Sequence, residues 1–212
     1  MPLPRFDRLP AERQERILAV ARGHFADHGT EAASYNKIIE AAGFSKTAAY
    51  HYFDGREDLL AAVLDGVLDR LLGALGPWGA ARDEAEFWTR LDASASMLAA
   101  HLRDHPDDLA LADAAIGRTR EQDGQWLAWY GDLVADGQRL GVIRTDVDHD
   151  LLVTVTAAVF GAADAWALAR MKATPPPPEP PESEDGAQLW RLLRGLWSRT
   201  GSFFDEGNTD AH

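Results

Sequence analysis

Apolar residues recur at spacings of three and four along most of the chain, and this period constrains the fold more than any other feature of the sequence. Residues 59–72, "LLAAVLDGVLDRLL", carry it most clearly, with Leu59, Val63 and Val67 on one helical stripe. The alternation of apolar and polar residues that indicates strands is nearly absent. With 212 residues, 46% of them apolar, the chain can bury a sizeable core. An all-α fold is therefore predicted.

Capping and stop residues divide this pattern into about nine helices. The first is expected to begin near Pro10 and to stop at Gly29. The expected N-caps are Ser34, Ser45, Asp54 with Glu57 as its capping-box partner, and Asp148. Beyond residue 80, helices are expected at residues 83–101, 106–117, 120–140, 149–172 and 187–204.

The stretch at residues 41–53, "AAGFSKTAAYHYF", contains no acid, although the chain has a formal net charge of −13. Its turn at Gly43 and the helix after Ser45 predict a helix-turn-helix, with Phe44 filling the gap between the two helices. The second helix has a donor face of Lys46, Thr47, Tyr50 and His51 and an apolar face of Ala49 and Phe53. This division suits a recognition helix in the major groove of DNA; a solvated helix face without acids is the alternative.

The negative charge is concentrated after residue 60. Residues 1–60 contain eight basic and nine acidic residues, a net charge of −1, so residues 61–212 carry the remaining −12. Long-range repulsion of a polyanion is therefore weakest at the N-terminal end. Any contact with nucleic acid is expected there rather than on the acidic body.

Composition and hydropathy predict a cytoplasmic protein. The absence of cysteine excludes disulfides and thiolate metal sites, and residues 1–10 contain no apolar run typical of a signal peptide. Residues 151–171 are long and apolar enough to cross a bilayer, but Asp164 lies within them, at a cost of about 2.5–3.5 kcal/mol at mid-membrane. A buried helix at a subunit interface is expected instead of a membrane span.

Residues 16–64 resemble the N-terminal DNA-binding domain of the TetR family of bacterial transcriptional regulators. The matching landmarks are Phe25 and Gly29 closing the first helix, Ser34 opening the second, Ala42 and Gly43 at the turn, Tyr50 and Phe53 near the end of the third, and Arg56 ahead of Leu59. The resemblance implies two domains, residues 1–56 for DNA binding and residues 57–212 for ligand binding and dimerisation.

The resemblance also implies which residues contact a double-stranded DNA operator. Base-edge or nearby phosphate contacts are implied for Lys46, Thr47, Tyr50 and His51, and phosphate contacts for Ser34, Tyr35, Tyr52 and Arg56. Arg56 has a separate physical reason, because the first turn of a helix favours an anion. Three positions depart from the family pattern: Thr47 replaces a common glycine, Ala49 a larger aliphatic residue and Arg56 the commonest lysine.

The last two expected helices are separated by a proline-rich connector at residues 174–186, which cannot be helical. The resemblance implies that the helices at residues 149–172 and 187–204 pair with those of a second copy, giving a homodimer with a four-helix interface. Two helix-turn-helix units would then face successive major grooves, and the operator would be palindromic.

Aromatic residues in the C-terminal part suggest an effector pocket, because repressors of this family usually respond to a small molecule held there. The expected pocket residues are Trp88, Met97, Trp126, Trp129, Tyr130, Phe160, Trp166 and, as polar anchors, Asp164 or Asp132. For each of these residues ordinary core packing is the alternative. The predicted function is a repressor released from its operator by a small apolar or aromatic ligand, with no cofactor.

Two other classes of protein are compatible with parts of the sequence. His101 and His105, with acids nearby, could belong to a metal-dependent enzyme, but Pro106 and the acids after it are also what a helix start looks like. No phosphate loop, nucleophile elbow or glycine fingerprint is found, so no enzyme is expected. A helical ligand-binding dimer without DNA binding is the other alternative, and the donor face at residues 46–51 argues against it.

Overall fold

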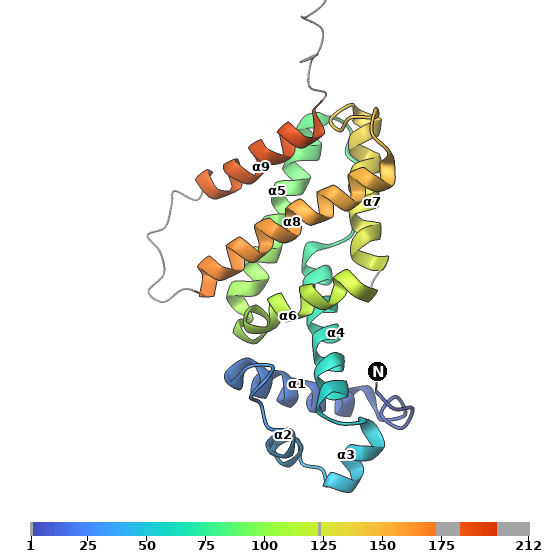
Figure 1. Ribbon diagram of the computed structural model, residues 1–212, viewed down its shortest axis with the longest axis vertical. Helices are drawn as coiled ribbons and strands as arrows, with labels where there is room; N and C mark the ends of the chain where they lie inside the picture. The colour runs from blue at the N-terminus through green and yellow to red at the C-terminus, as the bar shows by residue number, and fades with distance from the viewer. Residues whose placement is uncertain (1, 123, 173–182, 199–212) are drawn as a thin grey trace, which may run out of the picture.

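The computed structural model describes residues 2–122, 124–172 and 183–198, and within them it contains nine helices and no strand (Figure 1). The helices are α1 (Ala11–His28), α2 (Tyr35–Ala41), α3 (Lys46–Tyr52), α4 (Arg56–Leu75), α5 (Glu84–Asp104), α6 (Pro106–Gln122), α7 (Gly124–Leu140), α8 (His149–Lys172) and α9 (Ser183–Trp197). The predicted all-α class and the number of helices are confirmed.

The first three helices form one end of the molecule, and α4 runs from this end into the helical body (Figure 1). Helix α1 buries Ile17, Ala21 and Phe25 along one stripe and ends at Gly29, whose φ of 81° closes the helix. Helix α4 is buried along nearly its whole length by apolar residues of both parts. One continuous apolar core therefore joins the N-terminal helices to the body.

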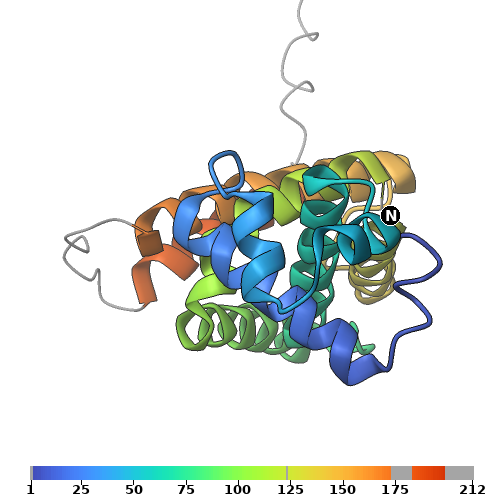
Figure 2. The same cartoon turned by 90° about the horizontal axis from the view of Figure 1, so that it is seen from below.

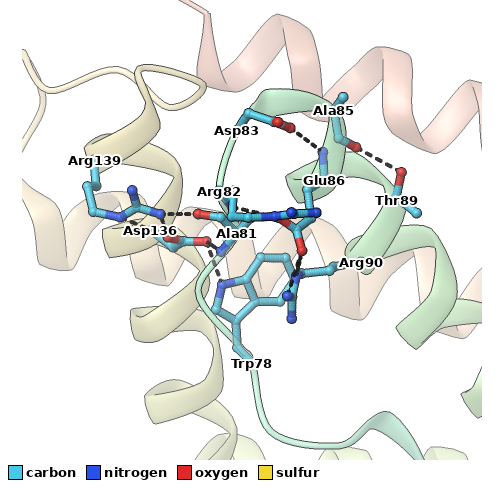
Figure 3. Close-up of polar contacts among 10 residues, drawn as sticks. All are labelled: Trp78, Ala81, Arg82, Asp83, Ala85, Glu86, Thr89, Arg90, Asp136 and Arg139. Carbon is cyan, nitrogen blue, oxygen red and sulfur yellow. Dashed lines mark hydrogen bonds and ion pairs between the residues drawn. The ribbon is translucent and has the colours of Figure 1, made fainter.

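The connection between α4 and α5 is fixed by one buried acid on α7 (Figure 3). The side-chain nitrogen of Trp78 and the backbone N–H of Ala81 donate hydrogen bonds to Asp136 at 3.1 and 2.9 Å, and Arg139 forms an ion pair with it. Burial works against ionisation, but these hydrogen bonds outweigh it and hold the pKa of Asp136 below its ordinary value. The connecting loop is thereby tied to the core of the body.

Five of the predicted helix limits were wrong by three residues or more. Helix α5 continues to Asp104 rather than ending at residue 101, and α7 begins at Gly124 rather than at residue 120. Helix α6 continues to Gln122 rather than ending at residue 117, and α9 runs over Ser183–Trp197 rather than residues 187–204. The end of the proline-rich connector is thus the start of α9, because its "SEDG" sequence has no proline and can enter a helix. Residues 174–182 of the connector and residues 199–204 lie outside the described residues.

Three of the four predicted N-cap positions are confirmed, and two of these three residues cap with their side chains. Ser45 accepts a hydrogen bond from the N–H of Ala48 at 3.2 Å, and Asp148 accepts one from Leu151 at 3.0 Å. Ser34 lies at the N-cap of α2 but makes no capping hydrogen bond with its side chain.

The capping box predicted for Asp54 and Glu57 is not formed. Gly55 occupies the N-cap of α4 with a φ of 132°, and helix α4 begins at Arg56. This start places Asp58, not Glu57, at the third helical position, and its carboxylate accepts a hydrogen bond from the N–H of Asp54 at 3.2 Å.

Candidate DNA-binding and effector sites

Helix α3 lies at the exposed end of the molecule (Figures 1 and 2). Its side chains separate into a buried face and an exposed face, as the sequence predicts. Ala49, and Phe53 at the end of the helix, are fully buried. Lys46, Thr47, Tyr50 and His51 are all exposed, and the side chain of Tyr50 is 62% exposed. The outward face of α3 therefore presents an ammonium, a hydroxyl, a phenol and an imidazole, groups that can contact base edges and phosphates.

The turn before α3 holds the helix at a fixed angle to α2. Gly43 adopts a φ of 74°, which favours glycine, and Ser45 caps the next helix. Phe44 is half-buried and packs its ring 5.9 Å from that of Tyr52. These contacts close the helix-turn-helix and fix the orientation of the exposed face.

Tyr35 lies beside the exposed face of α3, and its hydroxyl group makes no hydrogen bond to another described residue. Its ring centroid is 6.3 Å from that of Tyr50, and the hydroxyl is buried. Burial, with smaller contributions from Tyr50 and Asp58, raises the pKa of Tyr35. The phenol therefore stays protonated and can donate to a phosphate oxygen.

Arg56 lies inside the domain rather than on its surface. Its Nε donates to the backbone oxygen of Ala33 at 3.0 Å, its guanidinium lies 5.7 Å from the centre of the Phe25 ring, and Glu57 pairs with it. One of its terminal nitrogens is buried without a hydrogen-bond partner among the described residues. Arg56 thus joins α4 to the loop before α2, while Ser34 and Tyr52 are half-buried at the two ends of the helix-turn-helix.

Four of the expected effector residues are brought together between α7 and α8. The ring of Tyr130 lies 5.3 Å from Trp129, 5.4 Å from Phe160 and 6.3 Å from Trp126, and all four side chains are buried. Trp129 donates to the backbone oxygen of Gly76 at 2.9 Å, so it also has a structural role. The indole nitrogen of Trp126 is buried without a partner among the described residues.

Asp164 on α8 lies near this aromatic group. Burial raises the pKa of Asp164 to about 6, and no hydrogen bond or ion pair of its carboxylate is found among the described residues. Burial, and to a smaller extent the charge of Asp164, raises the pKa of Tyr130. The other expected anchor, Asp132, is exposed on α7.

The remaining three expected effector residues lie elsewhere. Trp88 packs 5.8 Å from the ring of Trp197, with the guanidinium of Arg194 over its own ring at 4.2 Å. Met97 and Trp166 are exposed, Trp166 by 47%. The structure therefore does not bring these three residues to the group around Tyr130.

The two histidines considered as metal ligands have another role. His101 Nε2 lies 2.9 Å from Asp108, and the His101 and His105 rings are 4.3 Å apart. Asp108 is buried and also binds Arg70 of α4, a pairing that sequence reasoning missed. Among the residues described by the structure, no group of three or more histidine or acidic side chains could hold a metal ion.

The fold and the exposed face of α3 define a helix-turn-helix DNA-binding regulator. Residues 17–63 match the family described as "Bacterial regulatory proteins, tetR family". The chain is 32% identical over 168 residues to the HTH-type transcriptional repressor KstR2 of Rhodococcus jostii, covering 74% of this chain and 78% of that protein. The chain therefore belongs to the TetR family of transcriptional regulators, which are not enzymes.

A second relative is similar over much of its length, and two solved structures share the fold. KstR2 of Mycolicibacterium smegmatis is 29% identical over 154 residues, covering 68% of this chain and 73% of that protein. A TetR-family regulator from Rhodococcus sp. superposes with a TM-score of 0.58 at 18% identity, over 89% of this chain and all of that one. A TetR-family regulator from Pectobacterium atrosepticum gives 0.57 at 23% identity, over 91% and 99% of the two chains. These two structures share the fold.

Proposed function

We propose that the protein is a homodimeric, cytoplasmic repressor that binds a palindromic DNA operator through α3 and leaves it when a small molecule binds the body. The observation that carries the proposal is the division of α3, whose polar face is exposed while Ala49 and Phe53 are buried. The relatives named as transcriptional repressors support the direction of control. Residues 1–56 would bind DNA, and residues 57–212 would bind the ligand and the second subunit.

Dimerisation would use α8 and α9. Helix α8 is the one described helix long and apolar enough to cross a membrane, and only 28% of that stretch is buried within the chain. Trp166 on α8 and Leu192 on α9 are exposed, Leu192 by 68%. A second copy packed on this surface would cover the apolar side chains and hold two α3 helices at the separation of successive major grooves.

The effector would be a small, largely apolar or aromatic molecule bound at the residues around Tyr130. Trp126 offers an unpaired indole donor there and Asp164 a carboxyl group without a hydrogen-bond partner among the described residues. Because α4 packs against both parts of the chain, a ligand that favours one position of α4 must change operator affinity reciprocally.

Operator binding can be tested by titrating the purified protein into labelled DNA from upstream of its own gene, against a scrambled duplex of equal length. We expect binding to the upstream DNA that is salt-sensitive and tighter by a factor of roughly 10³ or more. Lys46→Ala should weaken this binding, and Tyr50→Ala should also relax its sequence preference. Arg82→Ala, in the loop before α5, should do neither. Equal, weak binding to both duplexes would favour a ligand-binding dimer without DNA recognition.

A further inference from the structure

The segment before α1 is folded against the end of α3. The N–H of Leu3 donates to the backbone oxygen of Tyr52 at 2.8 Å. Phe6 is 3% exposed, and its ring lies 4.8 Å from Phe53 and 6.3 Å from Tyr52. The start of the chain is therefore anchored on the same two residues that end the helix-turn-helix.

The other end of this segment is fixed to the first turns of α1. The side chain of Gln14 donates to the backbone oxygens of Leu9 at 2.8 Å and Asp7 at 3.2 Å. Within the segment, the N–H groups of Phe6 and Leu9 donate to the oxygens of Leu3 and Phe6. N-terminal residues usually fray unless they are held in this way. Residues 2–9 thus form a fixed brace.

The brace carries two unpaired cations. Arg5 and Arg8 flank the buried Phe6 and are both exposed. Neither guanidinium forms a hydrogen bond or ion pair with any residue that the structure describes. Asp7 is the one acid in the segment, so residues 2–9 have a net charge of +1 within an acidic chain. Their placement on a fixed backbone reduces the entropy that each would lose on binding an anion.

Figure 2 shows where the segment that carries Arg5 and Arg8 runs relative to α3. In this view onto the end of the molecule, the darkest blue segment projects sideways beyond α3 and the start of α4. Because Leu3 and Phe6 contact Tyr52 and Phe53 at the end of α3, a duplex bound to the outward face of α3 would pass beside this segment. The groups nearest to it there would be the sugar-phosphate backbone beside the base pairs that α3 contacts.

We propose that Arg5 and Arg8 bind backbone phosphates of the DNA that flanks each half-site. The inference rests on the proposed operator binding, and it adds a contact outside the helix-turn-helix. A guanidinium can donate two parallel hydrogen bonds to a phosphate, which suits both residues to this role. Such contacts strengthen binding to any sequence and so position the protein without specifying the operator.

The test compares the parent protein with Arg5→Ala, Arg8→Ala and the double variant on operator DNA at several salt concentrations. Arg82→Ala is the control, since its side chain is 86% exposed and it precedes α5 at the far end of the molecule (Figure 1). The slope of log K against log salt is negative, and each single brace substitution should reduce its magnitude by about 2. The reason is that one phosphate contact, which contributes about −0.9 to the slope, is lost from each of two subunits. The preference for operator over scrambled DNA should be unchanged.

A shortened duplex provides a second, independent readout. Trimming the DNA to the palindrome should weaken the parent but leave the double variant unaffected, since the variant no longer uses the flanking phosphates. A parent that binds its operator while the brace variants match Arg82→Ala in slope would overturn the inference and leave the proposed function intact. A parent protein that shows no specific binding to the operator would contradict both the proposed function and this inference. Circular dichroism melting of each variant checks that the brace substitutions leave the fold unchanged.

Discussion

Arg70 on α4 donates two hydrogen bonds to Asp108 on α6, with distances of 2.9 Å from Nε and 2.8 Å from Nη2. Asp108 is 1% exposed and also lies 2.9 Å from Nε2 of His101 on α5 and 3.8 Å from Nε of Arg22 on α1. One carboxylate thus contacts side chains from three other helices. Because α1 belongs to the N-terminal domain and α6 to the body, this cluster joins the two parts through charge as well as apolar packing.

Asp108→Ala should lower the free energy of unfolding by about 3–5 kcal/mol, because Arg70 would keep a partly buried charge without its partner. Asp107→Ala is the matched control, an adjacent and more exposed acid 3.8 Å from Arg22. Its effect should be below about 1 kcal/mol. Urea unfolding measures both, and equal losses would show that the position in the first turn of α6 matters more than the ion pair.

The contribution of Asp108 should also depend on pH. Burial opposes its ionisation, but hydrogen bonds from Arg70 and His101 outweigh burial and hold the pKa of Asp108 below its ordinary value. A group with a lowered folded-state pKa stabilises the protein above its unfolded pKa, about 3.9, and the contribution disappears as the pH falls through the folded-state pKa. The stability difference between the parent and Asp108→Asn should therefore stay constant above about pH 5 and shrink as the pH falls below about 4. A difference that also stays constant at the lower pH values would contradict this origin.

Arg56→Ala separates a structural role from a DNA contact. Loss of the hydrogen bond to the buried oxygen of Ala33 should reduce the free energy of unfolding by about 1–3 kcal/mol. Arg16→Ala, which breaks an exposed pair with Glu12 on α1, should change it by less than about 0.5 kcal/mol. Thermal unfolding without DNA is the measurement. An Arg56→Ala variant as stable as the parent, with a flatter salt dependence of DNA binding, would instead favour the phosphate contact.

The two faces of α3 could be predicted from the sequence because they depend on neighbouring residues. Helical period and the cap at Ser45 act within a few residues, and both were visible in residues 41–53. The Asp108 cluster could not be predicted, since Arg70 is 38 residues away and an acid after Pro106 fits any helix start. Which helices pack together decides that pairing, and only the structure supplies it.

The effector residues show the same limit. Composition indicated that aromatic side chains were abundant on α7 and α8, and the structure brings Trp126, Tyr130 and Phe160 together. Met97 and Trp166 have the same apolar character but lie on exposed helix faces. An amphipathic period locates a buried face only when the opposite face is polar, and α8 is apolar all round. Its packing could therefore not be derived from the pattern.

Asp164→Asn should stabilise the protein at neutral pH. Burial raises the folded-state pKa of Asp164 to about 6, so ionisation costs the folded state stability as the pH rises from about 4 to 6. Removing the charge should recover on the order of 2–3 kcal/mol above pH 7 and almost nothing at pH 4. Asp132→Asn, an exposed position on α7, is the control. Melting temperatures at pH 4.5 and 7.5 test this, and an equal shift at both values would show that charge is not the cause.

Leu192→Glu and Trp166→Glu should separate the proposed dimer into monomers. Both side chains are exposed on α9 and α8, and a carboxylate in the apolar centre of an interface would lose its hydration without gaining a partner. Leu127→Glu is the matched control, because Leu127 is an exposed leucine on α7, outside α8 and α9. Light scattering coupled to size-exclusion chromatography should give half the parent mass for the first two variants and the parent mass for the control. The monomeric variants should also lose affinity for a palindromic operator, since each subunit would then bind a single half-site. Dimers that persist in both interface variants would place the interface on another surface of the body.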